Sequence, residues 1–188
     1  MRDSQLFDYS QWIDYQLNGV HMSTTASDHQ KLWDLIKGIK FGMFTHRHAN
    51  GMLHSQPLTT MNKSMDEGDK LYFFVSRDSD VVKQLMQDDN VNVSYTGPSD
   101  DSYVSVSGKA LVVEDMGKKE ELWSPMAKAW FPGGPTDPAL ALVQVRISHA
   151  EYWDVKKSKM VQVAKMVTAA ITGTPPVNMG EHKELRMP

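Results

Sequence analysis

The sequence contains no cysteine in its 188 residues. A disulfide scaffold, cysteine-ligated zinc or iron–sulfur centres and a cysteine nucleophile are therefore excluded. It also has no strong excess of one charge, since the formal net charge is -3. This balance argues against a basic nucleic-acid surface and against a polybasic membrane patch. We therefore expect neither nucleic acid nor a membrane among the partners.

Long hydrophobic segments are missing as well. Apolar runs such as 139–145 are far shorter than the roughly 20 residues that a membrane-spanning helix needs. Residues 1–20 are polar and lack the apolar centre of a signal peptide, so the expected location is cytoplasmic. A composition of 40% hydrophobic and 23% charged residues is typical of one globular domain.

Several chemical motifs are absent. No glycine pair forms G-x-G, and the P-loop, H-E-x-x-H and G-x-S-x-G patterns do not occur. A phosphate-bearing ligand would therefore have to be held in some other way.

The chain divides by pattern into three parts. Residues 1–25 form an N-terminal extension, 26–173 a single domain, and 174–188 a C-terminal tail expected at the surface. In the extension, aromatic side chains lie among polar ones, and a second methionine stands at Met22. Either Met22 is the native start, or the first 21 residues form a short helix docked by its aromatics.

Hydrophobic periodicity predicts mainly β structure. A helix is expected over 28–39, with Ser27 as its N-cap and Gln30 completing a capping box. Further helices are expected over 79–87, 117–130 and 159–171, the second interrupted at Pro125. Strands are expected over 41–47, 52–61, 71–75, 91–96, 103–114 and 140–155. Because short turns join several of the strands, we expect a six-stranded antiparallel barrel with helices outside it.

Three histidines suggest one metal hypothesis. His46 and His48 share a face of a predicted strand, and His54 returns across the hairpin. Three imidazoles can hold zinc or iron. Since no carboxylate lies near them in this segment, and water-exposed turn histidines are far commoner, we expect no metal site.

Two further features each have a functional and a structural interpretation. Ser79 opens a predicted helix, where its hydroxyl and free N–H groups suit a phosphate, or where it is an ordinary N-cap. Trp123, Trp130, Phe131 and Trp153 suit a flat aromatic ligand, or a core or subunit interface.

Several segments resemble a known family, namely 73–79 (FFVSRDS), 90–95 (NVNVSY), 103–110 (YVSVSGKA), 122–126 (LWSPM), 130–134 (WFPGG), 137–138 (DP) and 150–154 (AEYWD). Together they resemble the pyridoxamine 5'-phosphate oxidase-like proteins, in particular the bacterial general-stress-protein branch. The resemblance covers residues 28–173. It implies an FMN-binding split barrel that works as a homodimer, with the flavin between two subunits; FAD is the alternative cofactor.

The resemblance also implies which residues bind the cofactor. They are His54, Ser55, Gln56, Pro57 and Leu58 on one strand, Phe74, Val75 and Ser76 on its neighbour, Ser79 at the phosphate, Trp153 close to the flavin, and Trp130 with Phe131 closing the pocket from the partner subunit. Lys83, one helical turn on from Ser79, is added as a nearby charge. Two positions depart from the family. Gln56 stands where many relatives have arginine, and Val81 where many have lysine. Lys83 and Arg77 are expected to compensate in part.

The expected function is that of an FMN-dependent oxidoreductase of stress physiology with an unknown substrate. No catalytic acid or base stands out; His54 is the nearest candidate. The alternative is a flavin-binding module that buffers or senses flavin without turnover. The pyridoxamine phosphate oxidase reaction itself and a histidine-ligated haem remain weaker alternatives.

Overall fold

The computed structural model describes residues 26–64, 69–97, 101–154 and 181–186. In chain order the elements are α2 (Ala26–Ile36), β1 (Gly42–Arg47), β2 (Leu53–Leu58), β3 (Lys70–Ser76), α3 (Asp80–Leu85), β4 (Asn90–Gly97), β5 (Ser102–Val113), α4 (Met116–Leu122), α5 (Pro125–Trp130), a 3-10 turn (Gly134–Thr136), β6 (Leu140–Asp154) and β7 (Glu181–Arg186). No helix within these ranges is long and apolar enough to cross a membrane.

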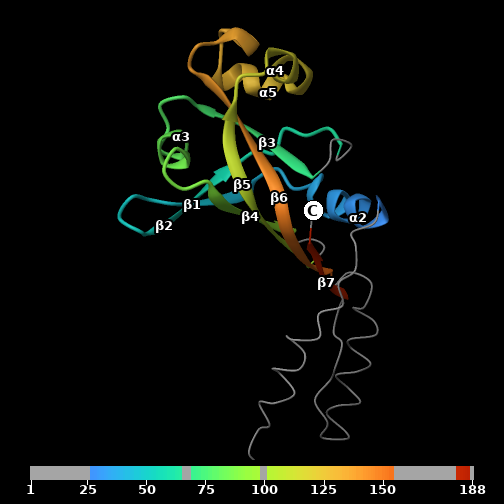
Figure 1. Cartoon of the computed structure of the whole chain (residues 1–188). Helices are drawn as coiled ribbons and strands as arrows, with labels where there is room; N and C mark the ends of the chain where they lie inside the picture. Colours follow the sequence, from blue (N-terminus) through green and yellow to red (C-terminus); the bar gives the residue numbers. More distant parts are fainter. Residues whose placement is uncertain (1–25, 65–68, 98–100, 155–180, 187–188) are drawn as a thin grey trace, which may run out of the picture.

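The strands form one antiparallel sheet that curls into a split barrel. The strand order is β2-β1-β4-β5-β6-β3, and β7 pairs with β6 beside this path. The two end strands approach each other just beyond β2, where Thr60 bridges to Phe73 and the Met61 N–H donates to the Tyr72 carbonyl at 2.8 Å. The predicted antiparallel barrel with outer helices is thus confirmed (Figure 1).

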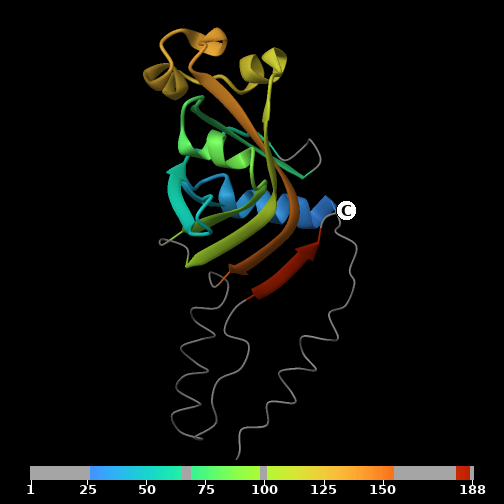
Figure 2. The ribbon, with the colours of Figure 1, turned by 60° about the vertical axis from the view of Figure 1, so that its left-hand side comes forward.

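The long pair β5–β6 shapes this barrel. Its register shifts between Ser107 and Gly108. A Cβ atom at Gly108 would lie 2.1 Å from the Arg146 carbonyl oxygen, so only glycine permits this approach of the two backbones. The first half of β6 pairs with β3, and its second half, beyond the irregularity, pairs with β7. Figure 2 shows the curvature of these strands.

The C-terminal segment is part of the sheet, contrary to the surface tail that we expected. β7 pairs with the second half of β6, from His149 opposite Arg186 to Asp154 opposite Glu181. Leu185 is only 3% exposed and belongs to the main core, and Lys183 forms an ion pair with Asp28 of α2. A single buried leucine in a short polar segment gives no recognisable strand pattern, which is why the sequence suggested a tail.

Two of the predicted helices differ from those in the structure. α2 begins at Ala26, so Ser27 lies within the helix and is not its N-cap. The helix expected over 117–130 is two helices, because Ser124 caps a new helix whose first residue is Pro125. The helix expected over 159–171 lies outside the described residues.

The main core fills the barrel and the space under α2 and α3. It includes Leu32 and Ile36 of α2, Val81 and Leu85 of α3, and apolar residues of every strand except β2. A smaller cluster of Tyr72, Leu122 and Leu142 seats α4 on the outside of the sheet. These contacts fix β3 relative to α3 and α4.

Candidate functional site

A cavity of about 450 Å³ opens where the two end strands of the barrel meet. Its volume is within the range of small-molecule sites. The lining residues come from the end of β2 and the segment after it, the end of β3, the start of α3, and α5 with its flanks: Phe41, Gln56, Pro57, Leu58, Thr59, Met61, Phe74, Val75, Ser76, Ser79, Ser124, Met126, Ala127, Trp130, Phe131 and Ala139.

Two helix caps position the polar part of this lining. The Ser79 side chain accepts a hydrogen bond from the Val82 N–H at 3.5 Å and caps α3. The Ser124 side chain accepts from the Ala127 N–H at 3.2 Å and caps α5. The N-cap interpretation of Ser79 is therefore confirmed, and both serines also line the cavity.

The lining carries no ionisable side chain. Each of the sixteen lining residues found in the described part of the chain is apolar, hydroxylic or an amide. Such a wall suits a flat, largely uncharged ring system whose edges accept or donate a few hydrogen bonds. It supplies neither an acid–base group nor a cation.

Most of the residues that the family resemblance assigned to a cofactor meet at this cavity. Nine line it, namely Gln56, Pro57, Leu58, Phe74, Val75, Ser76, Ser79, Trp130 and Phe131. Trp130 and Phe131, expected from the partner subunit, line the cavity of their own chain. His54, Ser55, Lys83 and Trp153 are not among the lining residues. The Ser55 hydroxyl instead contacts that of Thr45 on β1 at 2.7 Å.

Trp153 is remote from the cavity of its own chain. The cavity includes Ala139, just before β6 begins, whereas Trp153 is the penultimate residue of that strand. Thirteen residue steps of about 3.3 Å separate Leu140 from Trp153 by up to about 43 Å. Figures 1 and 2 place α5 and β7 at opposite ends of β6.

Arg77 and Lys83, the two cations expected to compensate for the family's arginine and lysine, differ in their partners. Arg77 is already occupied: its guanidinium donates to the Pro138 and Leu140 carbonyls and pairs with Glu114 at 2.7 Å. It ties β3 to the start of β6 and is not available as a compensating charge. Lys83 is exposed and lies 3.9 Å from Asp80.

Val81, at the other departing position, has no exposed surface and belongs to the core. A lysine there would bury an ammonium group in apolar surroundings, which is strongly unfavourable. The packing around position 81 of this chain therefore favours valine over lysine.

Seven lining residues were not anticipated: Phe41, Thr59, Met61, Ser124, Met126, Ala127 and Ala139. Ser124 and Met126 belong to the LWSPM segment that carries the resemblance, and that was the signal available for them. The others come to the cavity only through the meeting of β2, β3 and α5.

The three histidines gather away from this lining. His46 and His54 are direct partners across the β1–β2 hairpin, and His48 follows at the turn. The expectation that these histidines face water is wrong for His46, which is 1% exposed. Burial lowers the pKa of His46, and the neighbouring His48 and His54 lower it further, whereas the Asp80 carboxylate acts in the opposite direction.

This nearly closed antiparallel barrel, with an uncharged cavity between its end strands, defines a split-barrel protein. The chain belongs to the family described as pyridoxamine 5'-phosphate oxidase like, whose model matches residues 27–176.

Individual proteins are similar along most of the chain. The Protein bli-3 of Neurospora crassa is 29% identical over 167 residues, which cover 82% of this chain and 79% of that protein. A crystal structure of the general stress FMN/FAD binding protein from Xanthomonas citri is 29% identical with a TM-score of 0.60, over 69% of this chain and 90% of the other. A candidate general stress protein 26 from Jannaschia sp. CCS1 shares the fold, with a TM-score of 0.68 at 20% identity over 87% of this chain and all of that one.

Proposed function

We propose that the protein is an FMN-binding flavoprotein of the general stress protein type that acts as an oxidoreductase on an unidentified substrate. The observation that carries the proposal is the cavity itself. Nine residues assigned to flavin by the family resemblance line one apolar, uncharged space at the junction of β2, β3 and α5. The similar protein of Xanthomonas citri is described as binding FMN or FAD, which supports a flavin here.

In this proposal the chain's residues bind and orient. Phe74, Trp130 and Phe131 supply aromatic surface that excludes water from a ring. The Gln56 amide and the hydroxyls of Ser76 and Ser79 offer hydrogen bonds to polar ring edges and to a phosphate. A bound flavin would supply the redox chemistry, and the protein would supply position and electrostatics.

The same cavity supports a homodimer. Trp130 is 79% exposed although it lines the cavity, and Phe41 and Met126 beside it are about half exposed. Exposed apolar groups that cluster at a cavity mark an interaction surface. A second copy would cover them, and it would bring its own Trp153 to the flavin, which one chain cannot do. Light scattering should find a dimer at micromolar concentration.

The test of the flavin proposal is the visible spectrum of the purified protein. We expect flavin bands in the protein as isolated or after addition of FMN, and quenching of flavin fluorescence on titration. Riboflavin and FAD titrated in parallel separate recognition of the ring, the phosphate and the adenylate. A protein that gains no flavin bands with any of the three would refute the proposal.

One observation favours a second candidate, a flavin-binding module without turnover. No lining residue of the described chain can exchange a proton near neutral pH, so acid–base assistance would have to come from the substrate, from water or from a second copy. Steady NADH or NADPH consumption that scales with bound flavin would support the oxidoreductase. Its absence with both donors and several acceptors, despite stoichiometric flavin, would support the module.

A further inference from the structure

The imidazoles of His46, His48 and His54 converge on one another at the β1–β2 hairpin. Each offers a ring nitrogen, and these nitrogens all lie within 4.8 Å of one another. The ring centroids are 5.0 Å apart for His46 and His48, and for His48 and His54. Three nitrogens bound to one tetrahedral metal ion at about 2.0–2.1 Å would stand about 3.4 Å apart. The nitrogens would therefore have to approach one another by up to about 1.4 Å to bind one ion.

The nitrogens are also unpartnered. Neither ring nitrogen of His46 has a hydrogen-bond partner among the described residues, although the side chain is 99% buried, and the buried Nε2 of His48 likewise has none there. Buried polar groups without partners are rare in folded proteins, because each forfeits its hydration. Hydrogen bonding within the protein therefore does not account for this cluster.

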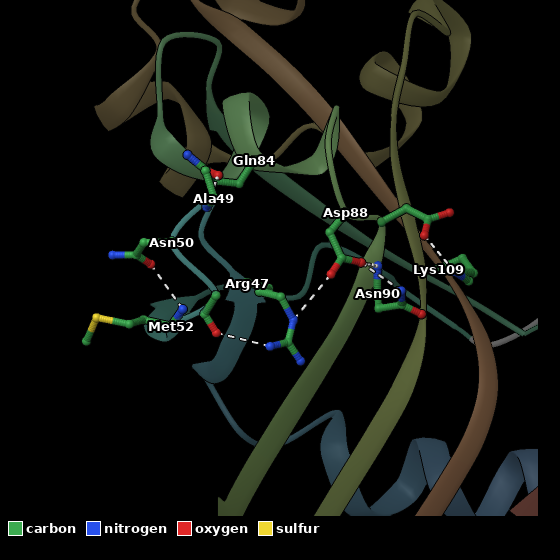
Figure 3. A network of polar contacts seen from close by, with 10 residues as sticks. Arg47, Ala49, Asn50, Met52, Gln84, Asp88, Asn90 and Lys109 are labelled. Carbon is green, nitrogen blue, oxygen red and sulfur yellow. Dashed lines mark hydrogen bonds and ion pairs between the residues drawn. The ribbon is translucent and has the colours of Figure 1, made fainter.

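The hairpin that carries the histidines is held in place from two sides (Figure 3). The Ala49 N–H donates to the Gln84 side chain of α3 at 3.0 Å. Arg47 donates to the Gly51 carbonyl at 3.0 Å across the turn and pairs with Asp88 at 3.4 Å. These contacts fix the turn without using any of the three imidazoles, so the cluster is preorganised.

From this geometry we propose that His46, His48 and His54 form a binding site for a divalent transition-metal ion, with Zn²⁺ as the expected occupant. Three imidazoles are a donor set that Zn²⁺, Cu²⁺ and Ni²⁺ accept and that Mg²⁺ and Ca²⁺, which prefer oxygen, do not. Three protein ligands leave the fourth tetrahedral position to water or a bound group. His54 is exposed and His48 partly so, which gives an ion access from solvent.

The site is independent of the flavin proposal. None of the three histidines lines the cavity between β2 and β3. Arg47, the cation within the hairpin, pairs with Asp88 at 3.4 Å instead of with the cluster. The competing role for the histidines is contact with a flavin phosphate, and the test separates the two.

The experiment measures Zn²⁺ binding to the full chain, produced without a polyhistidine tag and stripped with a chelator. Calorimetric titration with Zn²⁺ alone should give one ion per chain. Cu²⁺ in its place should show electron paramagnetic resonance splitting from coordinated nitrogen. His48→Ala and His54→Ala should each weaken Zn²⁺ at least as much as the roughly 10–100-fold that loss of an outer-shell partner costs.

The matched control is His149→Ala, which removes a histidine on β6 that faces Glu184 at 3.5 Å outside the cluster. It should keep wild-type Zn²⁺ affinity, and circular dichroism should show that all three variants fold. FMN titration of His48→Ala gives the second readout, and we expect unchanged affinity.

Three results would overturn the proposal: no stoichiometric Zn²⁺ binding by the wild type, an equal loss in His149→Ala and His54→Ala, or a loss of FMN affinity in His48→Ala with Zn²⁺ binding intact. The last result would assign the histidines to the phosphate. Because the Zn²⁺ titration contains no flavin, a protein that binds the ion but gains no flavin bands with FMN, riboflavin or FAD refutes the flavin proposal and leaves this one standing.

Discussion

Truncation of Leu185 tests whether the C-terminal strand holds the barrel together. Leu185 is 3% exposed and contacts the main core from β7. Replacement of a buried leucine by alanine costs about 2–5 kcal/mol, through lost burial and the cavity left behind. Because β7 lies at the sheet edge and pairs only with β6 among the described strands, its surroundings can relax. We therefore expect about 2–3 kcal/mol for Leu185→Ala.

That loss is large against the roughly 5–15 kcal/mol by which folded domains are stable. For a chain of this size it corresponds to a fall in melting temperature of about 4–12 °C. Urea unfolding followed by tryptophan fluorescence gives the free energy directly. The matched control is Glu184→Ala on the same strand, a half-exposed position that should change stability by less than about 0.5 kcal/mol. If Leu185→Ala were as mild as this control, β7 would not belong to the core.

Four further outcomes follow from the structure. Gly108→Ala should cost at least about 3 kcal/mol in urea unfolding, since its Cβ would meet a backbone oxygen at 2.1 Å. The pKa of Glu114 is held below its ordinary value of 4.5, mainly by the hydrogen bond from Arg77. This interaction should stabilise the fold above the unfolded pKa of the carboxyl group, and the stabilisation should be lost as the pH falls through the lower folded pKa. Glu114→Gln should therefore cost at most about 1 kcal/mol at neutral pH and nothing in strong acid. Trp130→Ala should weaken FMN and riboflavin alike, by about 5–150-fold if ring stacking contributes about 1–3 kcal/mol, and an unchanged titration would remove this residue from the site. Lys83→Ala should weaken FMN less than about tenfold, spare riboflavin and lose its effect at high salt, because the ammonium is exposed; equal losses for both ligands would place the phosphate elsewhere.

The candidate site was foreseeable wherever a residue's identity matched a family position. Gln56, Ser79 and Trp130 were assigned in this way, and the structure brings them to one cavity. Arg77 and Val81 show the limit of that reasoning. Whether an arginine is free or bonded to distant carbonyls, and whether a valine faces the core, depends on segments far away in the sequence.

The three histidines also show what sequence spacing can predict and what it cannot. Their spacing revealed a shared strand face, because side chains two residues apart point the same way. The burial of His46 and the loss of its hydrogen-bond partners depend on how α3 and the hairpin close over it, and no local pattern carries that information.

By itself the sequence determined the order of strands and turns, since alternation and turn residues act over a few neighbours. Asn50-Gly51 placed the first hairpin, where Gly51 adopts a φ of 84°, and Pro125 divided the outer helix. The tertiary structure alone decided which strands meet at the cavity, that the chain end returns as β7, and that His46 is buried. Those outcomes depend on contacts between residues far apart along the chain, whose free energy appears only when the barrel closes.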